Sequence, residues 1–252
     1  MITHNVALFV TCLVDFFRPS VGLAAVKLLE SHSCTVSIPK IQTCCGQPAY
    51  NSGDRDGSIA IAKKVISAFA DYDYVVVPSG SCAGMIIKHY PDLFADDPTM
   101  EPQAHELAER TYELITFLTK ILKVDKSLEP FHGTVTYHHS CSSLRELGIR
   151  DEASNLLRKT RGVEYRELKG AEQCCGFGGT FCIKYPEVSV DMVARKTSAI
   201  AETGAQTVLS GDLGCLLNIA GRLRREGSKI EVRHIAEILA GIGTTPAIGQ
   251  RR

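Results

Sequence analysis

Two short stretches of this 252-residue chain decide how it is organised: Gln42-Thr43-Cys44-Cys45-Gly46 and Glu172-Gln173-Cys174-Cys175-Gly176. Each holds an adjacent pair of cysteines followed by glycine, in nearly the same frame. One cysteine precedes each pair and another follows it, at almost equal spacing in the two cases. We interpret this pattern as an internal duplication. Its outer cysteines are Cys12 and Cys82 in the first set, and Cys141 and Cys215 in the second.

β-Rich runs alternate with helical patterns along the sequence. Strands are predicted over 6–10, 74–77, 134–137, 163–165 and 207–209, and one long helix over 104–122. This alternation predicts an α/β fold with two similar halves, each a short parallel sheet flanked by helices. Pro130 and Gly133 mark a seam between the halves. We therefore expect a first cysteine-rich domain over 1–123 and a second over 134–252.

The single cysteines of both sets closely follow predicted strands, at their carboxyl ends. Ligands of open α/β sheets gather at that edge. Cys82 and Cys215 also lie at or just before a predicted helix start, where backbone N–H groups stabilise a thiolate. Neighbouring side chains of an extended chain point to opposite faces, so each cysteine pair needs a tight turn. Gly46 and Gly176 allow the φ that such a turn requires. Each half can therefore present four thiolates to one point.

Three kinds of site could use four such thiolates. Disulfides need an oxidising compartment, whereas the N-terminal residues lack the basic region of a secretory signal, so we expect a cytoplasmic protein. Structural zinc is usually held by short Cys-x-x-Cys pairs, which this sequence lacks. Iron–sulfur clusters accept widely spaced cysteines, and a cationic core would relieve repulsion among the thiolates. The sequence favours one cluster per half and leaves zinc open, with Cys12, Cys44, Cys45, Cys82, Cys141, Cys174, Cys175 and Cys215 as metal ligands.

Other residues are expected beside the clusters without ligating them. His138 could donate a hydrogen bond to sulfur, or could simply bond to backbone at the end of a strand. Cys182 is expected to be a bystander near the second site, and Cys34 a small buried hydrophobe. Backbone N–H groups of the glycine-rich turns could hydrogen-bond to the sulfurs. The possible neighbours of the clusters are His138, His139, Cys182, Ser79, Asp212, Gly46 and Gly176.

The residues around the cysteines carry a family resemblance. The matching strings are Thr43-Cys44-Cys45-Gly46-Gln47-Pro48-Ala49-Tyr50-Asn51, Pro78-Ser79-Gly80-Ser81-Cys82, His138-His139-Ser140-Cys141 and Cys174-Cys175-Gly176-Phe177-Gly178-Gly179-Thr180-Phe181. They resemble the cysteine-rich CCG domains found in heterodisulfide reductase, in succinate dehydrogenase and in the iron–sulfur subunit of glycolate oxidase. The short, two-domain lactate utilisation protein A family is the best match. The resemblance implies that the CCG cysteines ligate [4Fe–4S] clusters. It also implies a role in oxidising L-lactate to pyruvate with two partners, a ferredoxin-like iron–sulfur subunit and a third subunit.

The sequence departs from the heterodisulfide reductase pattern at two positions. Ser79 and Asp212 stand where that pattern has the first cysteine of a Cys-x-x-Cys element. Each half thus has four sulfurs where the pattern has five. This favours a cubane cluster with four protein ligands over a non-cubane one, and it argues against disulfide-reducing chemistry.

Composition and motifs exclude several classes of function. Lys+Arg and Asp+Glu number 28 each with no basic run, so no nucleic-acid partner is expected. No apolar stretch approaches the ~20 residues that span a bilayer. No G-x-G-x-x-G follows a predicted strand, so we find no flavin or NAD site. Oxidation of a 2-hydroxy acid needs such an acceptor, so we expect an electron-transfer subunit that is not an enzyme alone. The alternatives are a zinc- or thiol-based module and a heterodisulfide-reductase-like thiol enzyme.

Overall fold

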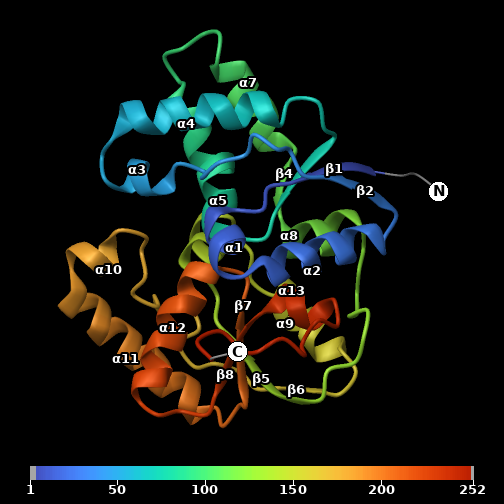
Figure 1. Ribbon diagram of the computed structural model, residues 1–252, viewed down its shortest axis with the longest axis vertical. Helices are drawn as coiled ribbons and strands as arrows, with labels where there is room; N and C mark the ends of the chain where they lie inside the picture. Colours follow the sequence, from blue (N-terminus) through green and yellow to red (C-terminus); the bar gives the residue numbers. More distant parts are fainter. Residues whose placement is uncertain (1–3, 251–252) are drawn as a thin grey trace. The chain divides into compact units, whose positions relative to one another are not determined.

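The computed structural model describes residues 4–250. The chain divides into two compact units, Met1–Leu122 and Lys123–Arg252. Each unit contains one sheet of four parallel strands flanked by helices, as predicted (Figure 1).

Unit 1 has the strand order β2-β1-β3-β4. Its central strands are short apolar runs, and Val75, Val76 and Val77 of β3 are fully buried. The strands are β1 (His4–Leu8), β2 (Cys34–Ser37), β3 (Tyr74–Val77) and β4 (Thr111–Glu113). The helices are α1 (Cys12–Phe17), α2 (Pro19–Glu30), α3 (Gln47–Asn51), α4 (Arg55–Ala68), α5 (Gly80–Gly84), η1 (Met85–His89), α6 (Tyr90–Leu93), α7 (Glu101–Glu109), α8 (Leu114–Thr116) and η2 (Phe117–Ile121).

Unit 2 repeats this order as β6-β5-β7-β8. Its core includes Val208 and Leu209 of β7 and Leu216 on the following helix, all fully buried. The strands are β5 (Gly133–Tyr137), β6 (Val163–Tyr165), β7 (Thr207–Ser210) and β8 (Glu231–His234). The helices are η3 (Ser142–Glu146), α9 (Glu152–Lys159), α10 (Phe181–Lys184), α11 (Pro186–Glu202), α12 (Leu213–Arg225) and α13 (Ile235–Leu239).

The strand order creates a topological switch point in each sheet. From β1 the chain crosses to β2 on one side, and then returns past β1 to β3 on the other. Because such crossovers are right-handed, the helices of the two connections cover opposite faces. In Figure 1, α2 and α4 accordingly lie on opposite sides of β1. A crevice forms outside the carboxyl ends of strands where the order reverses, here between β1 and β3 and between β5 and β7.

The prediction of one long helix over 104–122 is wrong. Helix α7 ends at Glu109, and β4 follows and pairs with β3, with Thr111 opposite Val75. The apolar residues of this stretch do recur at helical spacing, but Thr111 and Tyr112 have higher strand than helix propensity. They pair with the otherwise free edge of β3 instead of continuing the helix. Strands β2, β4 and β8 were not predicted. All three are edge strands, which are short and less apolar because one side lacks a strand partner.

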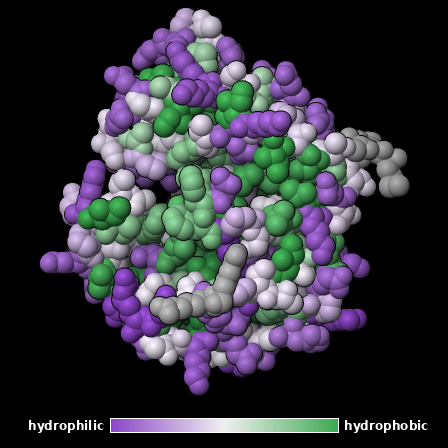
Figure 2. Space-filling view, viewed as in Figure 1, coloured by the Kyte–Doolittle hydropathy of each residue, from purple (hydrophilic) through white to green (hydrophobic). Residues whose placement is uncertain are grey.

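The surface mixes hydrophilic and hydrophobic residues (Figure 2). Large apolar side chains are strongly exposed in both units, among them Phe16, Ile41 and Ile183, each more than three-quarters exposed. No helix within residues 4–250 is both long enough and apolar enough to cross a membrane.

Candidate metal centres

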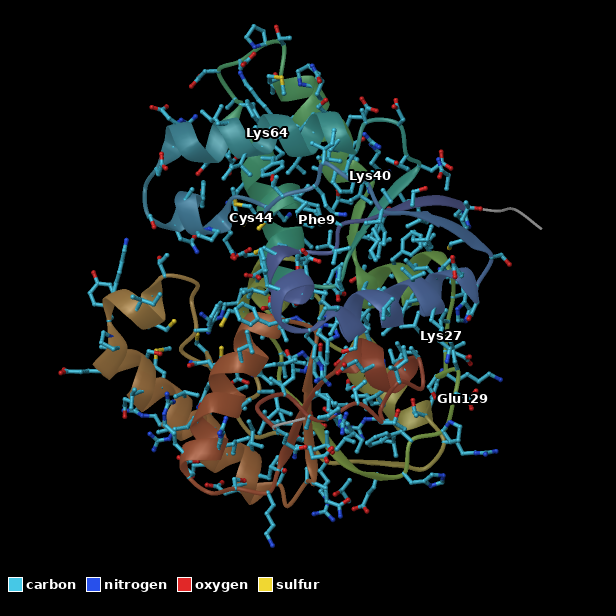
Figure 3. The ribbon with its side chains drawn as sticks, viewed as in Figure 1. Phe9, Lys27, Lys40, Cys44, Lys64 and Glu129 are labelled. Atoms are coloured by element: carbon cyan, nitrogen blue, oxygen red, sulfur yellow. The ribbon has the colours of Figure 1, made fainter. Side chains whose placement is uncertain are left out.

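The cysteines of the first set come from three segments at the carboxyl edge of the unit 1 sheet. Cys12 begins α1 just after β1, and Cys82 lies in the first turn of α5 after β3. Cys44 and Cys45 lie between β2 and α3, and Cys44 is labelled in Figure 3. The single cysteines thus flank the switch point, and the pair reaches it from the loop after β2.

A left-handed glycine completes each cysteine turn. Gly46 has φ +86° and Gly176 has φ +81°, as the sequence predicts. The carbonyl that precedes each glycine is fixed by a side chain. Tyr90 Oη donates to the Cys45 carbonyl at 2.9 Å, and Asn218 Nδ2 donates to the Cys175 carbonyl at 2.8 Å.

The thiols of unit 1 form a continuous chain of contacts. The Sγ atoms of Cys12 and Cys44 are 3.8 Å apart, and Cys45 hydrogen-bonds to Cys44 and to Cys82. Hydrogen bonds from Cys12 and Cys45 lower the pKa of Cys44, helped by the backbone N–H of Gly46. The contact with Cys44, followed by burial, raises the pKa of Cys12. Thiols this close cannot all ionise unless a cation offsets their mutual repulsion.

Unit 2 repeats the arrangement. Cys141 lies directly before η3, after β5, and Cys215 lies in the first turn of α12, after β7. Hydrogen bonds from Cys141 and Cys175 lower the pKa of Cys174, and the Gly176 N–H donates to Cys174 Sγ at 3.3 Å. The order of contacts matches that of unit 1 and runs Cys141, Cys174, Cys175, Cys215.

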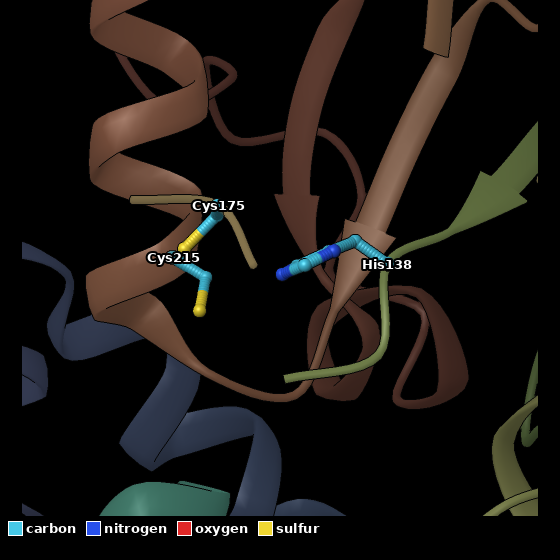
Figure 4. A group of neighbouring side chains, drawn as sticks. All are labelled: His138, Cys175 and Cys215. Carbon is cyan, nitrogen blue, oxygen red and sulfur yellow. The ribbon is translucent and has the colours of Figure 1, made fainter. Parts of the chain in front are cut away.

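A histidine joins the second set. The side chain of His138 points toward Cys175 and Cys215, and one potential ligand atom from each lies within 4.8 Å of the others (Figure 4). His138 is completely buried, and burial lowers its pKa to about 3, so its imidazole is neutral at pH 7. Within residues 4–250 neither of its ring nitrogens has a hydrogen-bond partner.

Several of the expected neighbours act on the helices that carry the cysteines. The Ser79 hydroxyl accepts from the Cys82 N–H at 3.4 Å and caps α5. Asp212 caps α12 by accepting from the Gly214 N–H at 3.2 Å. These residues therefore fix the first helical turn after β3 and after β7.

Two further expected neighbours, His139 and Cys182, make contacts of their own, and Cys34 is buried as predicted. His139 packs edge-on against Tyr137, with ring centroids 4.9 Å apart, and is not in the group formed by His138. Cys182 lies in α10, and its Sγ donates to the Gly179 carbonyl at 3.3 Å. Cys34 is buried at the start of β2, and burial raises its pKa to about 11, which fits a small apolar role.

Sequence reasoning missed Lys196. It lies in α11, is completely buried, and donates from Nζ to the Gly170 carbonyl at 2.7 Å and the Ala171 carbonyl at 3.4 Å. It thereby holds the loop that leads into the second cysteine pair. The signal was present in the sequence, because Lys196 falls between Val193 and Ile200 on the apolar face of the predicted helix.

The two turn glycines give a matched prediction. Alanine at either position adopts an unfavourable φ, at a cost of roughly 1–2 kcal/mol. At Gly46 the nearest atom to the added Cβ would be Ile61 Cγ2 at 3.4 Å, whereas at Gly176 the Ser189 carbonyl oxygen would be only 2.7 Å away. We expect Gly176→Ala to lower the free energy of unfolding more than Gly46→Ala, as measured by urea denaturation. Equal losses would contradict this.

A cavity of about 560 Å³ opens beside the first set. Cys12, Cys44 and Lys40 are among its lining residues, together with the exposed Phe16 and Ile38. A larger cavity of about 690 Å³ lies at the opposite edge of the unit 2 sheet, where β5, β7 and β8 begin, and no cysteine lines it. Of these two cavities, the first is lined by thiols and the second is not.

Both sites fit a thiolate-bound metal group. Each offers sulfurs gathered at helix starts, with a backbone N–H directed at the central sulfur from Gly46 or Gly176. In unit 2 the unpartnered imidazole of His138 faces the same point. Soft sulfur donors select zinc, copper(I) or iron–sulfur clusters rather than magnesium or calcium.

Comparison with known proteins agrees with the duplication. The family described as "Cysteine-rich domain" (CCG) matches residues 6–87 and again 135–220, so this is a two-domain CCG protein. Lactate utilization protein A of Shouchella clausii is 50% identical over 235 residues, which cover 93% of this chain and 98% of that relative. Lactate utilization protein A of Bacillus subtilis is 47% identical, with the same coverage. The chain belongs to the lactate utilization protein A family.

A solved structure, of a hypothetical protein from Helicobacter pylori, has a similar fold. It is 12% identical, with a TM-score of 0.68, over 99% of this chain. This chain spans half the length of that one. The similarity shows the fold alone.

Proposed function

We propose that this chain is the iron–sulfur electron-transfer subunit of a complex that oxidises L-lactate to pyruvate. Its partners would be a ferredoxin-like iron–sulfur subunit and a third subunit. The convergence of four thiols at the switch point of each sheet supports this proposal most directly. The names of its relatives supply the lactate system.

One [4Fe–4S] cluster in each unit would be held by the four cysteines of that unit. Such a cluster supplies one-electron transfer when it is bound. Neighbouring thiols and the N–H of Gly46 or Gly176 lower the pKa of Cys44 and of Cys174, which prepares these two sulfurs to bind a cationic core. The second cysteine of each adjacent pair is shielded from solvent, since Cys45 is 2% exposed and Cys175 is 2% exposed, whereas the first cysteine of each pair is half-buried.

Exposed apolar side chains close in sequence to both cysteine pairs suit a protein partner. Exposed apolar side chains flank the first cysteine turn, with Ile38 and Ile41 on the approach to Cys44. Ile183 and Tyr185 are exposed beside Cys182 in unit 2. Exposed apolar groups of this kind often mark interaction surfaces, and an electron donor or acceptor must approach a cluster closely.

Zinc is the second candidate for unit 2. His138, Cys175 and Cys215 form a compact group of potential ligands, and structural zinc accepts mixed cysteine and histidine sets. Metal analysis of the anaerobically purified chain separates the two, since only a cluster contains acid-labile sulfide.

The test of the function compares the chain alone with the assembled complex. We expect lactate to reduce the clusters only when the partner subunits are present, as followed by electron paramagnetic resonance. We also expect the chain alone to form no pyruvate, because the oxidation needs a hydride or carbanion acceptor. Stoichiometric pyruvate formation by the purified chain alone would overturn the electron-carrier assignment. Clusters that lactate leaves oxidised in the full complex would overturn the lactate role.

A further inference from the structure

One difference between the two sites lies at the end of the first strand of each sheet. The Phe9 N–H donates to the Val76 carbonyl at 2.9 Å, next to the paired residues Leu8 and Val76. The His138 N–H likewise donates to the Leu209 carbonyl at 2.8 Å, next to the paired Tyr137 and Leu209. Phe9 and His138 therefore occupy the same place at the end of the first strand of their sheets.

Their side chains have different roles. Phe9, labelled in Figure 3, is fully buried in the unit 1 core. It packs against Phe69 with ring centroids 5.4 Å apart. The His138 imidazole instead faces Cys175 and Cys215 (Figure 4). Leaving a buried polar group without a hydrogen-bond partner is unfavourable. An imidazole so placed, with both ring nitrogens unpartnered, indicates that its partner is the group held by the thiols.

A second difference adds charge to the site in unit 2. Ser58 and Ile61 of α4 lie against the Gly46 turn, and Ser189 and Met192 of α11 lie against the Gly176 turn in the same way. Lys196 follows Ser189 in α11 by the same number of residues as Val65 follows Ser58 in α4. Lys196 therefore corresponds to an apolar residue, Val65, in unit 1.

The charges around the second thiol cluster do not cancel evenly. The Lys196 ammonium acts electrostatically on all four thiols of the second cluster. Asp212, where unit 1 has Ser79, opposes it and acts on Cys215, and Arg145 adds a positive contribution at Cys141. Glu172 acts on Lys196 itself, so two positive side chains, Lys196 and Arg145, act on these thiols beside the two carboxylates Asp212 and Glu172. Lys196 is the one of the four that acts on every thiol of the set.

We propose that His138 and Lys196 give the cluster of unit 2 a higher reduction potential than that of unit 1, so that electrons collect in unit 2. An N–H donor and a positive charge both stabilise the more negative, reduced state of a cluster. Unit 1 has Phe9 and Val65 at these positions, and neither side chain offers an N–H donor or a positive charge. This inference rests on the proposed function and adds a direction to electron movement within the chain.

The test is a redox titration of both clusters, monitored by electron paramagnetic resonance. Cys45→Ser and Cys175→Ser variants assign the signals to their units. In the unmodified chain we expect the unit 2 cluster to be reduced first. In His138→Phe, which installs the unit 1 residue, the equilibrium constant for its reduction should fall at least tenfold, or about 59 mV for one electron. His138→Gln keeps an N–H donor and should recover part of that loss.

His139→Phe is the matched control. This neighbouring histidine packs on Tyr137 rather than facing the thiols, so its replacement should leave both potentials unchanged. Equal potentials in the unmodified chain, or a unit 1 cluster that is reduced first, would overturn the inference. So would an unchanged potential in His138→Phe. The proposed function fails separately, if the anaerobic chain contains no clusters to titrate.

Discussion

Replacing Cys175 by serine is expected to remove the cluster of unit 2 and leave that of unit 1 intact. Cys175 is almost fully buried and contacts both Cys174 and Cys215, so it joins the two sides of its thiol cluster. Serine replaces a soft thiolate with a hydroxyl that binds iron poorly. The iron content should fall to about half, and one of two paramagnetic signals should disappear.

Cys45→Ser should have the reciprocal effect, since Cys45 joins Cys44 to Cys82 in the same way. Cys182→Ser is the matched control. This cysteine lies near the second pair in sequence but bonds to the Gly179 carbonyl, so both signals should remain. Loss of both signals in either single variant would show that the sites are not independent. Retention of both would show that the paired cysteines are not ligands.

Lys196→Met is expected to destabilise unit 2 and weaken its hold on the cluster. The side chain keeps its approximate length but no longer bonds to the carbonyls of Gly170 and Ala171. Each buried carbonyl left without a partner costs about 1–3 kcal/mol, partly offset because a buried charge is removed. We expect faster iron loss from unit 2 on exposure to a chelator, with the unit 1 signal unaffected.

Val65→Met is the control for this change. Val65 is buried at the equivalent position of α4, so this substitution places the same methionine there without removing a hydrogen bond. It should leave the rate of iron loss from unit 2 unchanged. If Lys196→Met retained iron as well as the unmodified chain does, the loop-holding role of Lys196 would be wrong.

The sequence was sufficient to predict the fold class and the gathering of the cysteines. The duplicated cysteine spacing defined two equivalent halves, and the central strands were apolar enough to be recognised. The carboxyl ends of parallel strands share one edge, so cysteines far apart along the chain could be expected to meet there. The structure brings them together in two separate sets.

The features that sequence did not predict depend on tertiary contacts. Strand β4 exists because β3 offers a free edge, although its residues continue a helical stripe. A lysine is usually exposed, and only the packing of α11 shows that the ammonium group of Lys196 reaches backbone carbonyls. The distinction between His138 and His139 likewise required side-chain directions, which two adjacent histidines do not reveal.

Iron and acid-labile sulfide counted in the anaerobically reconstituted chain test the central claim most directly. Two sets of four cysteines should yield about four iron and four sulfide ions in each unit, in equal amounts, with a brown colour. Stoichiometric zinc without sulfide, or reconstitution that leaves the thiols free to react with alkylating agents, would contradict the account.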